Sequence, residues 1–148
     1  QGTLGVILNR PMGRKLSDLD SSFIGKSFGD TPVYEGGPVE KEKLIIAAWE
    51  WLASPSSFKL YFGIDMEKAE NLQADNPSVK IACFVGHSGW SPGQLEHELN
   101  EDAWIVSALD KELFARLEDK QVVWKNVVGS VSDELRFLAD APDDPELN

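Results

Sequence analysis

The segment GHSGWSPGQLEHEL, residues 86–99, places serine, histidine and glutamate side chains close together in the sequence. Gly86-His87-Ser88 follows a short apolar stretch, as in the G-x-S-x-G turn that exposes the serine nucleophile of many hydrolases. That turn needs its second glycine where this sequence has Trp90. The histidine of a catalytic triad also normally comes from a distant loop, whereas His97 lies within the same segment. These residues therefore argue against Ser88 as a nucleophile.

A metal site is the second chemistry that this segment suggests, because His97 and Glu98 are followed by Glu101. Zinc proteases use H-E-x-x-H, so the second histidine is missing. On a helix, Leu95 and Leu99 would face the core and His97 would point toward solvent. Two histidines without cysteine ligands are also a poor set for a transition metal. We expect no metal site, and without a G-x-G-x-x-G run we expect no dinucleotide or other cofactor.

The remaining polar residues match no catalytic motif, but several of them could lie close together in the folded protein. On a helix, Gln94, Glu98 and Glu101 would lie in one stripe beside the leucine face and could border a cleft. Asn9 and Arg10, at the end of an apolar segment, offer amide and guanidinium donors for a carboxylate or a phosphate. The alternative is that Arg10 pairs with one of these glutamates and that the nearby glycines only permit tight turns.

The helix that carries this stripe has a start signal at Ser91-Pro92-Gly93-Gln94. The pattern predicts a capping box in which Ser91 is the N-cap, Pro92 is the first helical residue and Gln94 returns a hydrogen bond. The residues between the preceding strand and this helix are expected to form a glycine-rich loop.

Hydrophobic patterning predicts one α+β domain around a mixed sheet. Pro11 should end the first strand, since proline cannot donate to a ladder. Apolar residues alternate with others in 57–64, which predicts that one side of this strand covers the core. Residues 54–56 suggest a hairpin connection, and residues 122–131 fit a helix or a strand, with helix preferred. Strands are expected within residues 3–11, 31–39, 43–49, 57–64, 79–85 and 103–108, and helices at 17–19, 65–73 and around 109–117.

Composition narrows the class of protein. The 148 residues are 42% hydrophobic, which suits a single packed domain over residues 1–138, followed by an acidic flexible tail at 139–148. The net charge of −11, without a cluster of basic residues, argues against a nucleic-acid partner. The one cysteine, Cys83, fits an inert core thiol in a reducing compartment. No apolar run reaches the ~18–20 residues of a membrane span and no signal peptide is visible, so we expect a cytoplasmic protein.

Three segments, in this order, resemble the AlgH/YqgE family of bacterial proteins: GVILNRP (5–11), GGPV (36–39) and GHSGWSPGQLEHEL through AW (86–104). The resemblance runs from residue 2 to about residue 107. Many members have Tyr-Ala or a similar pair where this chain has His87-Ser88, so a catalytic role for either residue would be peculiar to this protein. The family's motif positions are matched here by Asn9, Arg10, Pro11, Gly36, Gly37, Pro38, Gly89, Trp90, Gly93, Gln94, Leu95, Glu96 and Trp104.

The resemblance implies an α+β fold in which a bulged mixed β-sheet is curled as a half-barrel, with helices packed over one side. It also implies a further pair of strands before GVILNRP, so the chain is expected to begin late in the domain. Members are commonly labelled transcriptional regulators, and the resemblance implies neither a catalytic activity nor a DNA contact.

Three functions stay open on the sequence. The preferred one is a regulatory or binding protein without catalysis, which holds a small anionic ligand or a segment of a protein partner. The second is an enzyme of unknown class, hydrolase-like, with Glu96 or Glu98 as general base. The third is a DNA-binding transcriptional regulator, which the net charge disfavours. The pocket of the preferred function would be walled by Asn9, Arg10, Pro11, Gly36, Gly37, Pro38, Gly89, Trp90, Gln94, Glu98 and Trp104.

Overall fold

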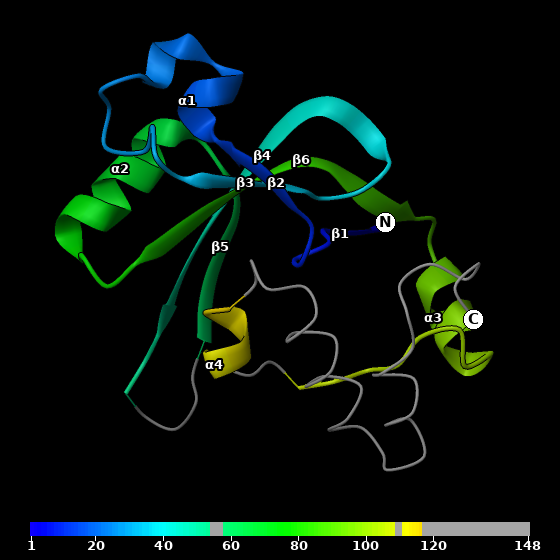
Figure 1. Ribbon diagram of the computed structural model, residues 1–148. Coiled ribbons are helices and arrows are strands. Elements are labelled where there is room, and N and C mark those ends of the chain that lie inside the picture. The colour runs from blue at the N-terminus through cyan, green and yellow to red at the C-terminus, as the bar shows by residue number, and fades with distance from the viewer. Residues whose placement is uncertain (54–57, 109–110, 117–148) are drawn as a thin grey trace, which may run out of the picture.

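A six-stranded mixed sheet organises residues 1–53, 58–108 and 111–116, which are the residues that the computed structural model describes (Figure 1). The β3–β6 pair is parallel and the other pairs among the described strands are antiparallel. Register shifts interrupt the β2–β3, β4–β5 and β4–β6 pairs, as in a bulged sheet. The predicted α+β class with a bulged mixed sheet is confirmed. The strands lie in the order β2 (Pro11–Lys15), β3 (Pro32–Glu35), β6 (Lys80–Trp90), β4 (Val39–Trp51) and β5 (Phe58–Ile64), and β1 (Thr3–Gly5) pairs with β6.

Strand β6 lies inside the sheet and is apolar on both faces because both faces are covered. Ala82, Cys83 and Phe84 are each at most 2% exposed. Cys83 is buried, as predicted for a core thiol, and burial raises the pKa of its thiol to about 12. The strand continues to Trp90, so the predicted loop after residue 85 is wrong. Gly86 adopts a φ of +73°, and this bend lets β6 pass a bulge and pair again beyond it.

One face of the sheet is covered by α1 (Leu16–Leu19), the 3-10 turn η1 (Ser21–Phe23) and α2 (Met66–Asp75), as Figure 1 shows. Leu16 of α1 and Ala69 of α2 are buried in one cluster with Ile46 and Cys83 of the sheet. The predicted helical turn and the predicted helix after Asp65 are therefore confirmed. The Asp65 carboxylate accepts a hydrogen bond from the Lys68 N–H at 2.7 Å, as expected of an N-cap.

The opposite face of the sheet packs against α4 (Lys111–Phe114). The Phe114 ring meets the Trp49 ring edge-on, with 4.8 Å between centroids. Around this contact lies the second core cluster, which consists of Tyr34, Ile45, Ala47, Trp49, Ala82 and Phe84.

The apolar alternation in β5 does not bury a whole side of the strand, which corrects the prediction for residues 57–64. Leu60 is 51% exposed and Phe62 is 41% exposed. Gly63 adopts a φ of +68° where the pairing with β4 shifts register, so an extra residue enters β5 there. The insertion changes which side the next residue faces, and Ile64 packs with the α2-side cluster instead. A period-2 pattern read from sequence assumes a strand without such a bulge.

The first predicted strand is also corrected. Strand β1 ends at Gly5, and Pro11 begins β2 instead of ending β1. Proline is tolerated at the first residue of a strand, where its missing N–H costs no ladder bond. Val6 and Leu8, between the two strands, pack against the α4-side cluster.

Residues 103–108 form no strand, although the sequence predicted one. Trp104, Ile105 and Val106 are 49%, 49% and 75% exposed, so this apolar run lies on the surface of the described structure. A strand requires a neighbour to pair its backbone groups, and a sequence pattern does not show whether a neighbour is present. No helix in the described part of the chain is long and apolar enough to cross a membrane. Outside the described residues lie the predicted hairpin connection at 54–56, residues 109, 110 and 117 of the predicted helix, residues 122–131 and the tail at 139–148.

Candidate functional site

Two tryptophans meet where β6 ends and the following helix turns back. Trp90 is the last residue of β6, and Trp104 follows α3 (Gln94–Asn100). Their rings are 5.8 Å apart between centroids and inclined at 72°, a favourable edge-on contact. Trp90 is half-buried and Trp104 is exposed, so one ring anchors the pair and the other presents a face to solvent.

Glu98 of α3 holds both indoles in place. Its Oε2 accepts hydrogen bonds from Trp104 Nε1 at 2.7 Å and from Trp90 Nε1 at 3.1 Å. Its Oε1 accepts a third, from Gln94 Nε2 at 3.0 Å. These three donors, in the order Trp104, Gln94 and Trp90, hold the pKa of Glu98 below its ordinary value of 4.5. The side chain is therefore a carboxylate at neutral pH, with both oxygens engaged.

This geometry bears on the chemistry proposed for Glu98. A general base is most effective when its pKa lies near the working pH and an oxygen faces the proton it removes. The pKa of Glu98 is instead lowered, which takes it further from neutral pH, and its oxygens face indole and amide N–H groups. The arrangement orients two aromatic rings and is suited to recognition.

The start of α3 differs from the predicted capping box. Gly93, with a φ of +79°, is the N-cap, and the helix begins at Gln94. Ser91 and Pro92 precede it, so the predicted roles of both residues are wrong. The return bond from Gln94 is confirmed, because its Oε1 accepts from the Ser91 N–H and from the Ser91 hydroxyl, both at 3.0 Å. A left-handed glycine after proline closes a separate turn before the helix, which a capping-box pattern does not reveal.

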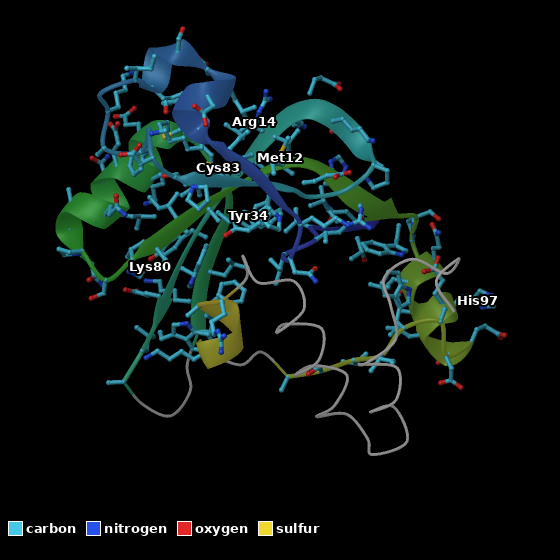
Figure 2. All side chains as sticks on the ribbon, viewed as in Figure 1. Met12, Arg14, Tyr34, Lys80, Cys83 and His97 are labelled. Carbon is cyan, nitrogen blue, oxygen red and sulfur yellow. The ribbon has the colours of Figure 1, made fainter. Side chains whose placement is uncertain are left out.

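The two histidines occupy different surroundings. His97 is exposed, as predicted, and Figure 2 shows it pointing away from the sheet. His87 is only 9% exposed, and its Nδ1 has no hydrogen-bond partner among the described residues. The Glu40 carboxylate lies 3.7 Å from that nitrogen. Within residues 1–53, 58–108 and 111–116, no three His, Cys, Asp or Glu side chains are grouped in a way that could hold a metal ion.

The Asn9-Arg10-Pro11 segment lies beside the Gly-Gly-Pro turn. The Arg10 carbonyl accepts from the Glu35 N–H, and the Gly36 carbonyl accepts from the Ile7 N–H, each at 2.8 Å. Asn9 and Pro11 are half-buried, whereas Arg10 is exposed. Arg10 forms no ion pair with a carboxylate of the described residues, so the alternative in which it pairs with a glutamate of α3 gains no support.

The glycines of the turn allow two backbones to touch. A Cβ atom at Gly36 would collide with the Gly86 carbonyl, and one at Gly37 would collide with the His87 backbone. A Cβ atom at Gly86 would in turn collide with the Gly37 carbonyl. These contacts give Gly36 and Gly37 a structural role, while Pro38 beside them is exposed.

The predicted pocket residues thus fall into two groups. The Asn9–Pro11 segment and the Gly36–Pro38 turn lie together, and the Trp90 network assembles the rest from β6, α3 and the residues after α3. Glu101, the third residue of the predicted stripe, is the exposed C-cap of α3 and does not join the network among the described residues. Two cavities lie among the described residues, one beside β2 and one beside α4, and Pro11 is the one residue of the predicted wall that lines either of these two.

Fold and geometry together define a mixed-sheet α+β protein with a surface pair of tryptophans held by one carboxylate. A family profile described as AlgH-like matches residues 1–136, and the chain belongs to this family. The resemblance seen in three short segments is therefore confirmed over most of the chain.

Relatives from distant bacteria match along the whole chain. A UPF0301 protein from Streptomyces avermitilis is 32% identical and is covered over 80% of its length, with all of this chain aligned. A UPF0301 protein from Chlorobium luteolum is also 32% identical, and 79% of it is covered by all of this chain.

Two solved structures share the fold. The solution structure of the AlgH protein from Pseudomonas aeruginosa superposes with a TM-score of 0.60 at 23% identity, over 97% of this chain and 80% of that one. The crystal structure of protein DIP2367 from Corynebacterium diphtheriae superposes with a TM-score of 0.65 at 21% identity, over 95% of this chain and 76% of that one. At these identities the likeness concerns the fold.

Proposed function

We propose that this protein acts by binding a partner and catalyses no reaction, and that the Trp90–Trp104 pair is its recognition surface. The observation that carries the proposal is the carboxylate of Glu98, whose oxygens accept from both indoles and from Gln94. Three neutral donors keep this carboxylate ionised, and it keeps the rings in one orientation before any partner arrives. Pre-organised aromatic side chains bind well because little conformational entropy remains to be lost.

The chemistry of the surface defines the class of partner. Exposed Trp104 continues into exposed Ile105 and Val106, which supplies apolar contact area. Exposed acidic side chains at Glu96 and Asp102 lie on and just after α3. A protein segment with apolar and basic side chains complements both features, and aromatic anchors commonly dominate the energy of such contacts.

A peptide selection tests this proposal. Random peptides displayed on phage are selected on the immobilised full chain and then measured on Trp104→Ala and Glu98→Gln. We expect selected peptides rich in apolar and basic residues, whose affinity falls at least about tenfold on either variant. Glu70→Gln is the matched control, because it removes the same charge from an exposed residue of α2 that lies outside the recognition surface and makes no hydrogen bond to another described residue. Peptides that bind all four proteins equally would refute the recognition surface.

The same variant addresses the catalytic alternative. Wild type and Glu98→Gln are compared on a panel of ester, amide and phosphate substrates. The proposal expects no activity that depends on Glu98, and a reproducible activity lost in Glu98→Gln would favour an enzyme. Binding of a small anionic ligand at Arg10 is a separate part of the proposed function. Its support is that Arg10 is exposed and forms no ion pair with a described carboxylate. Titration of wild type and Arg10→Met with inorganic phosphate tests anion binding at this residue.

A further inference from the structure

A cavity of about 460 Å³ lies between the sheet and α4, on the face opposite α1 and α2. Its size falls in the range of about 300–1,000 Å³ that is usual for small-molecule sites. None of its lining residues belongs to the tryptophan network around Glu98. Its apolar lining includes Tyr34, Trp49, Trp51, Ala82, Phe114 and Ala115.

The aromatic walls of this cavity are held by ring contacts. Phe114 stands edge-on to Trp49 at 4.8 Å and to Trp51 at 6.5 Å between centroids. Trp51 in turn contacts Phe58 at 4.7 Å. Between these large rings, Ala82 and Ala115 contribute only methyl groups to the lining, so open space remains next to fixed apolar walls. An apolar ring system fits such a space, because burying it removes apolar surface from water without ordering the walls.

Two lysines supply the polar part of the cavity. Lys80, at the start of β6, pairs in register with Trp49, so both side chains lie on the α4 side of the sheet. Figure 2 shows Tyr34 and Lys80 on this side. Lys111, the first residue of α4, also lines the cavity. Neither lysine forms an ion pair with a carboxylate of the described residues.

We propose that this cavity is a small-molecule site for a compound with an aromatic body and one anionic group, such as an aromatic carboxylate. The rings of Trp49, Trp51 and Phe114 take the body of the ligand. The ammonium groups of Lys80 and Lys111 meet its anionic end. In a chain with a net charge of −11, two lysines that form no ion pair with a described carboxylate lie at one apolar cavity, and their local positive field attracts such an anion.

A matched pair of probes tests the site in the full chain. 2-Naphthylacetate and 2-naphthylacetamide share the same ring system, and only the first carries a charge. Isothermal titration calorimetry should show saturable binding of the carboxylate and at least about fivefold weaker binding of the amide. Raising the salt concentration from 50 to 300 mM should weaken the binding of 2-naphthylacetate and leave that of the amide unchanged, since salt screens the charge of the lysines.

Three lysine variants locate the interaction. Lys80→Met and Lys111→Met keep an apolar stem and remove the charge, so each should weaken naphthylacetate about fivefold and leave the amide unchanged. Lys26→Met, in the loop after η1, removes the same charge from the opposite side of the sheet and should change neither ligand. Circular dichroism confirms that each variant is folded. Trp104→Ala should bind naphthylacetate like wild type, which separates this site from the recognition surface.

Three results would overturn the proposal: no saturable binding of either probe at millimolar concentration, equal affinity for acid and amide, or lysine variants at the cavity that behave like Lys26→Met. Loss of naphthylacetate binding in Trp104→Ala would also overturn it, because the bound site would then be the tryptophan surface. Peptide selection that fails while these calorimetric results hold would refute the recognition surface and leave the cavity in place.

Discussion

Glu98 determines how the tryptophan site responds to acid. Its pKa in the folded protein lies below the ordinary 4.5, because Trp104, Gln94 and Trp90 donate to the carboxylate. As the pH falls, the unfolded chain therefore takes up this proton before the folded chain does. The stabilisation that the ionised group contributes is complete above about pH 4.5 and is lost as the pH falls through the lower folded-state value.

The indole signals report this loss directly. In an NMR titration from pH 7 to pH 3, the Nε1–H resonances of Trp90 and Trp104 should hold steady to below pH 4.5 and then shift together. Glu98→Gln should abolish that common transition, since its side chain does not titrate. A transition near pH 6, or one that persists in Glu98→Gln, would show that another group controls the pair.

At the scale of elements, the crossing of the Gly-Gly-Pro turn over β6 joins β3, β4 and β6 through backbone contact. Gly86→Ala should destabilise the protein by about 2–4 kcal/mol, because its φ of +73° is left-handed and its Cβ would meet the Gly37 carbonyl. Gly89→Ala in the same strand is the control. Its Cβ would meet nothing within 4 Å, so we expect a change within about 1 kcal/mol. Urea denaturation measures the free energy of unfolding of both variants. Equal values would contradict the close backbone contact between the Gly-Gly-Pro turn and β6.

The same elements show which predictions a sequence supports. The helix after Asp65 was predicted because a carboxylate at an N-cap acts on the next few residues only. The exposed Leu60 and Phe62 were not predicted, because a period-2 pattern shows which residues share a side of a strand and not whether another element covers that side. The turn of Ile64 to the α2 side was not predicted either, because the bulge at Gly63 exists only where β5 pairs with β4. The return bond of Gln94 to Ser91 was predicted, while the start of α3 was displaced by the turn at Gly93.

At the scale of the whole molecule, the net charge predicts that this chain does not bind nucleic acid directly. Its 14 basic and 25 acidic residues give a net charge of −11, which repels a polyphosphate and leaves few counterions to release. We expect no saturable binding of a fluorescent DNA duplex up to about 100 µM protein at 50 mM salt, where non-specific binders saturate. Fluorescence anisotropy measures this. Binding that weakens steeply as salt increases would instead support a DNA-binding regulator.

The sequence by itself determined the family, the α+β class, the buried Cys83 strand and most members of the tryptophan site. Trp90, Gln94, Glu98 and Trp104 were all named from local spacing and resemblance, because helix periodicity and short motifs act over a few residues. Tertiary structure alone decided that Glu98 accepts from both indoles, since this requires Trp104 to return to the end of β6. It also decided the cavity between Lys80 and Lys111, whose walls come from separate strands and from α4. Such contacts depend on how elements pack, and no pattern within a single element encodes them.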